Sequence, residues 1–241
     1  MTLNQEQQAV VDSPAKKLLC IASAGSGKST VLCARIARLV ADGADPAKFL
    51  VISYTVAASR VLQERLGDIK LGFCGTLHAF SLKLLMQHGS LVGLPKTISV
   101  CDEETAQSLL ESIMSEMGCK TPMKQMIPLL KLAALIQPVK GMSRSKQELT
   151  VIEFHSRLRE SGLLTFDAIL FYAERLIPKM DWQFTHLFID EANDCAVEDW
   201  ALYDVMPCED VFIVGDPDQK IMGFRGACDI FEKRCLQFMN G

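Results

Sequence analysis

The chain has 241 residues, of which 49% are hydrophobic and 22% are charged, and its formal net charge is −4. This composition excludes an intrinsically disordered chain and is typical of one large or two small folded domains. The negative charge argues against a free-standing basic nucleic-acid module, because neutralising phosphates requires clustered Lys and Arg. The net charge is still compatible with a localised groove that binds a nucleic acid.

The nine cysteines are odd in number and form no CxxC pair, and several, such as Cys20 and Cys33, lie within apolar runs. They are expected to be reduced thiols in a cytosol-like compartment. No apolar run approaches the roughly 18 residues of a membrane span, and the polar N-terminus lacks the apolar core of a signal peptide. We therefore expect a cytoplasmic protein with no membrane partner.

Apolar, β-prone runs alternate with helical patterns in the first half of the chain. Strands are expected at residues 18–21, 49–54, 71–76 and 97–101, and helices at residues 3–11, 30–41, 56–66, 78–88 and 103–117. Asp102 is placed to cap the last of these helices. Strands that alternate with helices predict βαβ units and an α/β fold with a mostly parallel sheet.

Residues 121–178 show helical periodicity and no convincing strand. Helices are expected at residues 123–137, from the capping box of Ser145 and Glu148 to residue 160, and at residues 166–177, before strands return at 185–190 and 211–215. The pattern predicts an α/β lobe made of residues 1–120 and 179–241, with an all-helical insertion at residues 121–178.

Residues 22–29, ASAGSGKS, lie between the first expected strand and the next helix. Such a turn points backbone N–H groups at one anion, and Gly25 and Gly27 let the backbone wrap closely around it. Lys28 can reach the β- and γ-phosphates, and the Ser29 hydroxyl suits Mg²⁺. A small-residue loop before an ordinary helix is the alternative. The residues expected to bind a nucleotide here are Ala24, Gly25, Ser26, Gly27, Lys28, Ser29 and Thr30.

Two later strands end in polar residues, at the edge where open α/β sheets bind their ligands. The first delivers Asp190, which suits Mg²⁺, and Glu191, which suits positioning and deprotonating a water. The second ends in residues 215–219, where the amide of Gln219 could sense a γ-phosphate. Taken alone, Asp190 and Glu191 would be explained by a solvated strand end, and residues 215–218 by a simple turn.

Six segments carry a resemblance to a known family. They are LNxxQ at residues 3–7, ASAGSGKS at 22–29, SYTxxA at 53–58, GTLH at 75–78, DEAND at 190–194, and GDPDQ at 215–219 with FRGA at 224–227. In this order they resemble the Q motif and motifs I, Ia, Ib, II and III of superfamily 1 DNA helicases of the UvrD/Rep/PcrA type. The resemblance covers essentially the whole chain, and it implies a RecA-like P-loop lobe with a small helical domain emerging from it.

The resemblance also implies roles for residues that their own surroundings do not reveal. Gln7 would read the adenine edge of ATP, and Lys28, Asp190, Glu191 and Gln219 would act on ATP bound with Mg²⁺. Single-stranded DNA would cross the lobe at Tyr54, Thr55, Thr76, His78, Phe224 and Arg225. Aromatic faces accept any base, which permits sequence-tolerant binding with little net positive charge. Core packing is the alternative for Tyr54 and Phe224, and a structural role is the alternative for His78.

The resemblance implies an ATP-dependent 3′→5′ DNA helicase or translocase for repair, replication restart or phage replication. The chain stops before the family's second RecA-like lobe, with its arginines, so we expect an N-terminal fragment that binds Mg·ATP, hydrolyses it poorly and does not unwind. The second lobe would follow in a longer chain or act in trans.

Two alternative functions stay open. Val56 and Ala57 stand where relatives commonly have Asn and Lys, which leaves open a nucleotide-binding regulatory module that gates a partner. A small-molecule P-loop kinase is a third, less complete explanation.

Overall fold

The computed structural model describes residues 3–23, 25–133, 145–216, 218, 231 and 233–234. The chain divides into two compact units, which are described separately: Met1–Phe80 with Asp181–Gly241, and Ser81–Met180. The second unit begins before the predicted insertion at residue 121, so it also contains elements that the sequence assigned to the lobe. The assignment of residues 121–178 as a separate inserted domain remains a prediction.

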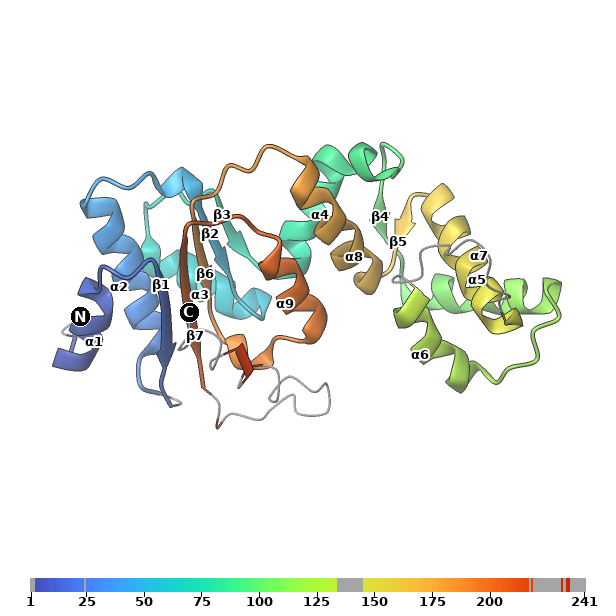
Figure 1. Ribbon diagram of the computed structural model, residues 1–241, viewed down its shortest axis with the longest axis horizontal. Coiled ribbons are helices and arrows are strands. Elements are labelled where there is room, and N and C mark those ends of the chain that lie inside the picture. Colours follow the sequence, from blue (N-terminus) through green and yellow to red (C-terminus); the bar gives the residue numbers. More distant parts are fainter. Residues whose placement is uncertain are drawn as a thin grey trace. The chain divides into compact units, whose positions relative to one another are not determined.

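The first unit contains a five-stranded sheet in which every pairing is parallel. Its strands are β1 (Lys17–Ile21), β2 (Phe49–Ile52), β3 (Phe73–Gly75), β6 (His186–Ile189) and β7 (Asp210–Gly215), in the order β1-β7-β6-β2-β3. Four residues of β2 are fully buried, as expected for a strand covered on both faces. The predicted α/β fold is confirmed (Figure 1).

Helices cover both faces of this sheet. Among the described residues, the α-helices that lie wholly within the first unit are α1 (Gln5–Asp12), α2 (Lys28–Ala41), α3 (Val56–Leu66) and α9 (Val197–Asp204). Ile36 of α2 and Leu62 of α3 share one hydrophobic core with Val51 and Phe188 of the sheet. The helices α2 and α9 lie on opposite sides of the sheet (Figure 1). Burying apolar side chains on both faces is the main source of stability for such a sheet.

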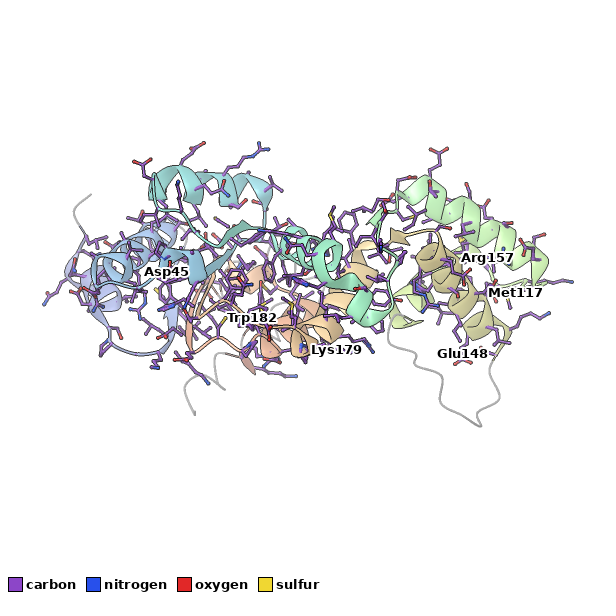
Figure 2. The ribbon with its side chains drawn as sticks, turned by 90° about the horizontal axis from the view of Figure 1, so that it is seen from above. Asp45, Met117, Glu148, Arg157, Lys179 and Trp182 are labelled. Carbon is purple, nitrogen blue, oxygen red and sulfur yellow. The ribbon has the colours of Figure 1, made fainter. Side chains whose placement is uncertain are left out.

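The second unit is mostly helical. It contains the later part of α4 (Leu77–His88), then α5 (Glu103–Glu116), α6 (Met123–Ala133), α7 (Lys146–Glu160) and α8 (Phe166–Leu176). Its core includes Ile113 and Phe154, which are fully buried. The predicted capping box is present, because Ser145 and Glu148 each bond the other's backbone N–H. On α7, the guanidinium of Arg157, which is labelled in Figure 2, donates to Glu116 of α5, with Nη2 to Oε2 at 2.6 Å.

The structure corrects two expectations about strands. The run at residues 97–101 forms only β4 (Ser99–Val100), which is exposed and does not join the main sheet. It pairs instead with β5 (Leu163–Leu164), although the sequence predicted no strand between residues 121 and 178. A two-residue strand carries no local periodicity, so its pairing depends on a partner far away in the chain.

Other boundaries agree closely with the sequence. The helix predicted at residues 56–66 is α3 itself, and the helix predicted at 123–137 is observed as α6 up to Ala133, with residues 134–137 outside the described part. The cysteines within the described residues are free, and burial raises the pKa of the Cys33 and Cys74 thiols to about 11. No helix in the described part of the chain is both long and apolar enough to cross a bilayer.

Candidate functional site

The carboxyl ends of all five strands meet at one edge of the main sheet, at its lower end in Figure 1. The register aligns Ile21 with Gly215, Ile189 with Ile52, and Ile52 with Gly75. The loops that follow the strands therefore leave the sheet side by side. Open parallel sheets place their ligand sites at this edge, because the strand ends and helix N-termini converge there.

The glycine-rich loop at residues 22–29 connects β1 to α2. Gly25 and Gly27 have φ angles of 73° and 86°, in the left-handed region that glycine adopts without strain. Gly27 is the N-cap of α2, so no side chain caps this helix. A Cβ on Gly27 would lie 2.9 Å from the Nε2 atom of Gln7. The loop thus presents uncapped backbone N–H groups at a helix N-terminus, which is a favourable place for an anion.

Lys28 is the first residue of α2, and only 7% of its surface is exposed. Its Nζ donates a hydrogen bond to the Ser23 carbonyl at 3.3 Å and lies 3.9 Å from Oδ2 of Asp216, which follows β7. An ammonium group has three donors, and neither of these contacts is short. The side chain is therefore held in place by weak contacts, and its charge is available to a stronger anionic partner.

Ser29 and Asp190 bring the ends of β1 and β6 together. The Ser29 hydroxyl donates to Oδ2 of Asp190 at 3.2 Å. Asp190 is 2% exposed, and its other oxygen, Oδ1, is buried with no partner among the described residues. Burial raises the pKa of Asp190, and the neighbouring Glu191 raises it further. A hydroxyl beside a carboxylate whose other oxygen lacks a partner is an arrangement that fits Mg²⁺.

Glu191 has a strained backbone. Its φ of 55° makes it the one non-glycine residue with positive φ in the described part of the chain. Its Oε2 is buried without a hydrogen bond, as is Oδ1 of Asp194 in the next turn. The pKa of Asp194 is raised by burial and by the charge of Glu191. Strain of this kind costs about 1–3 kcal/mol and is typical of functional sites.

Gln7 lies against the glycine-rich loop, and both ends of its amide are bonded. Oε1 accepts from the Asn4 backbone N–H at 2.9 Å, and Nε2 donates to the Ser26 carbonyl at 2.8 Å. The helix that carries Gln7 is anchored by the buried guanidinium of Arg35 on α2. This group donates to four backbone carbonyls, those of Val10, Val11, Ser13 and Ala15.

Tyr54, Thr55, Thr76 and His78 follow β2 and β3 at the same edge. Thr55 is exposed and caps α3 by accepting from the Ala58 N–H at 3.1 Å, and the Thr76 hydroxyl accepts from the Ala79 N–H at 3.3 Å. Tyr54 and His78 are half-buried. Each capping hydroxyl keeps its own proton, which it can still donate to another oxygen.

The predicted residues Ala24, Gln219, Phe224 and Arg225 lie outside the described residues. Thr30 is half-buried in the first turn of α2, and its Oγ1 accepts from Arg65 at 3.4 Å. Asp216 and Asn193 were not among the predicted site residues, but the structure places them at the centre of the edge. Asn193 Oδ1 accepts from the Asp216 N–H at 3.0 Å. Both lie in segments that carry the family resemblance, Asn193 in DEAND and Asp216 in GDPDQ, and these segments after β6 and β7 were the available signal.

The parallel sheet, with a glycine-rich loop leading from β1 into α2, defines a RecA-like P-loop domain. The family profile described as the UvrD/REP helicase N-terminal domain matches residues 3–233, and the chain belongs to that family. It is 27% identical to the ATP-dependent DNA helicase PcrA of Leuconostoc citreum, over 93% of this chain and 34% of that protein. It is 27% identical to DNA helicase II of Escherichia coli, over 94% of this chain and 35% of that protein.

A eukaryotic relative is the ATP-dependent DNA helicase srs2 of Schizosaccharomyces pombe, with 28% identity over 93% of this chain and 30% of that protein. The chain therefore spans about a third of the length of these curated relatives. Family membership and fold follow from these matches.

Proposed function

We propose that this chain is the ATP-binding motor lobe of an ATP-dependent DNA helicase or single-stranded-DNA translocase. The observation that carries the proposal is the pairing of Ser29 with Asp190 at 3.2 Å, directly next to the buried Lys28, at the carboxyl edge of the sheet. Two segments that are distant in sequence, the start of α2 and the end of β6, there present a cation, a hydroxyl and a carboxylate to one region. Two relatives are ATP-dependent DNA helicases, which supports the same assignment.

In this proposal different residues bind the phosphates, Mg²⁺, the attacking water and the adenine of the nucleotide. The N–H groups of the loop and the Lys28 ammonium bind the phosphates, and Ser29 and Asp190 would hold Mg²⁺, which neutralises phosphate charge when bound. Glu191 orients a water and accepts its proton, since it is placed beside Asp190 on a strained turn. Gln7 contacts the adenine, and Gln219 senses the γ-phosphate.

The proposed path of single-stranded DNA follows the other half of the same edge. Thr55, Thr76 and His78 would meet backbone phosphates, and Tyr54 would stack on a base, with Phe224 and Arg225 continuing the path. Stacking on aromatic faces contributes about 1–3 kcal/mol per base and tolerates any sequence. The 3′→5′ direction is taken from the family resemblance.

We propose further that efficient hydrolysis needs residues from a second lobe, in a longer chain or a partner chain. An arginine that reaches the transition state from another domain raises turnover by about 10³–10⁵. The 241 residues alone are then expected to bind Mg·ATP and to hydrolyse it far below the roughly 10 per second typical of enzymes.

Steady-state hydrolysis of Mg·ATP with and without single-stranded DNA tests this function, with nucleotide binding recorded separately. The variants are Lys28→Ala and Glu191→Gln, and Lys17→Ala is the matched control because it removes an exposed lysine at the opposite end of β1. We expect binding to depend on Lys28 and any residual turnover to depend on Glu191. Binding that is equal in wild type and Lys28→Ala would contradict the proposal.

One observation favours the second candidate, a regulatory module that gates a partner protein. Val56, directly after Thr55, is 56% exposed and presents an apolar side chain on the proposed DNA side. Apolar surface fits a protein partner better than a phosphate backbone. Saturable Mg·ATP binding without measurable affinity for single-stranded DNA would favour this alternative.

A further inference from the structure

Asp216 connects three separate segments at the carboxyl edge. Its Oδ2 lies 3.9 Å from the Lys28 Nζ, its Oδ1 accepts from the Asp218 N–H at 3.0 Å, and its own N–H donates to Asn193. It therefore links the glycine-rich loop, the turn after β6 and the turn after β7. The proposed nucleotide chemistry gives this residue no role.

The ion pair between Lys28 and Asp216 is buried but incomplete. The exposed fractions of the two side chains are 6% and 3%, so each charge depends on the other for the loss of its hydration. The separation of 3.9 Å is longer than a direct hydrogen bond. An ammonium held this way exchanges its partner readily when a more highly charged anion arrives.

We propose that Asp216 is a positioning residue that holds Lys28 while no phosphate is bound and releases it when a nucleoside diphosphate or triphosphate enters. This inference rests on the proposed nucleotide site. In the free protein Asp216 keeps the cation ordered, and in the loaded protein its charge opposes the bound phosphates. Asp216 thereby lowers nucleotide affinity. Because Asp216 also accepts from the Asp218 N–H, its release of Lys28 changes the surroundings of Asp218 in the turn after β7.

The first test compares ADP and adenosine binding in wild type and Asp216→Asn. The asparagine keeps an oxygen for the Asp218 N–H but removes the charge, so ADP should bind about tenfold more tightly. Adenosine affinity should not change, because adenosine has no phosphate to reach Lys28. A purely structural role for Asp216 would change both affinities alike, and unchanged ADP affinity would overturn the inference.

Asp218→Asn is the matched control. It removes one negative charge two residues away, from an exposed side chain whose backbone N–H, not its carboxylate, bonds Asp216. Its ADP affinity should rise much less than that of Asp216→Asn, and an equal rise would mean that general electrostatics, not the ion pair, sets the affinity. Asp216→Glu keeps the charge and should bind ADP no more tightly than wild type.

Wild-type protein provides a test that does not depend on the folding of a variant. In amide NMR spectra, ADP should shift the Asp216 and Asp218 N–H signals, and adenosine should leave them in place. ADP binding that leaves both signals unmoved would overturn the inference while keeping the proposed function. If wild-type protein fails to bind ADP at all, the proposed function itself fails.

Discussion

The two halves of the carboxyl edge are built differently. The proposed nucleotide half, formed by the loops after β1, β7 and β6, contains buried charged atoms with incomplete bonding, such as Lys28 Nζ, Asp190 Oδ1 and Glu191 Oε2. The proposed nucleic-acid half, formed by the loops after β2 and β3, contains hydroxyls that cap helices, such as those of Thr55 and Thr76. Buried polar groups left unpaired are costly, and this is the arrangement expected where a ligand supplies the missing partners. In the second half the same residues also stabilise the fold.

The largest expected effect is on the nucleotide half. Lys28→Ala should weaken Mg·ADP binding at least about 30-fold, because it removes charge-assisted hydrogen bonds worth about 2–3 kcal/mol. Equilibrium titration of both proteins measures this, with Lys17→Ala as the control that should bind like wild type. A loss below threefold would show that the buried cation does not face the ligand.

Arg35→Met should destabilise the lobe by about 2–3 kcal/mol, because it leaves several buried backbone carbonyls without donors. Burial and the neighbouring Arg38 lower the pKa of the Arg35 guanidinium, and four carbonyls compensate for that burial. Urea unfolding measures the difference. Arg38→Met serves as the comparison. It removes a bond to one carbonyl and an exposed ion pair with Asp42, from a more exposed side chain, and should cost less.

Asp190→Asn should separate stability from ligand binding. The pKa of Asp190 is raised in the folded protein, so its contribution to stability is present below the unfolded pKa and is lost as pH rises through the folded value. At neutral pH the asparagine should therefore leave the protein as stable as wild type or about 1 kcal/mol more stable, while the Mg²⁺ dependence of ADP binding disappears. Thermal unfolding and titrations with and without EDTA test the two halves of this expectation.

The same raised pKa predicts a pH dependence in wild-type protein. The Mg²⁺-dependent part of ADP affinity should fall as the pH drops through the raised pKa of Asp190, because a protonated carboxyl is a poor ligand for Mg²⁺. The fall should begin at a higher pH than for an ordinary aspartate, whose pKa is about 3.9. In Asp190→Asn this pH dependence should vanish, and its persistence would assign it to another group.

The smallest effect is expected in the nucleic-acid half. Thr55→Ala should cost about 1 kcal/mol of stability, because it removes the N-cap of α3. Thr55→Ser keeps the capping hydroxyl and should restore stability, and any loss of single-stranded-DNA affinity should be recovered with it. If Thr55→Ser restores stability but not affinity, the threonine methyl group takes part in binding.

The local structure was predicted best at positions where the backbone conformation or a helix cap requires one particular residue type. The glycine-rich loop was predictable because Gly25 and Gly27 adopt positive φ, and the start of α7 because Ser145 and Glu148 form a reciprocal cap. The helix α9 was not predicted. It has only eight residues, and such short helices depend on packing, here through the buried Trp200.

The features that depend on distant residues could not be derived from the sequence. The ion pair of Lys28 with Asp216 and the bond from Gln7 to the Ser26 carbonyl join segments far apart in the chain. Their distances follow from strand order and register, which local patterns do not determine. The edge on which these residues meet was predictable, because parallel strands bring their carboxyl ends together.

Calorimetric titration of the wild-type chain with Mg·ATP tests whether the carboxyl edge binds a nucleotide. One saturable site is expected, which ADP competes for and which weakens when Mg²⁺ is removed. No saturable binding up to about 1 mM, which corresponds to only about 4 kcal/mol, would contradict the claim that this edge is a nucleotide site.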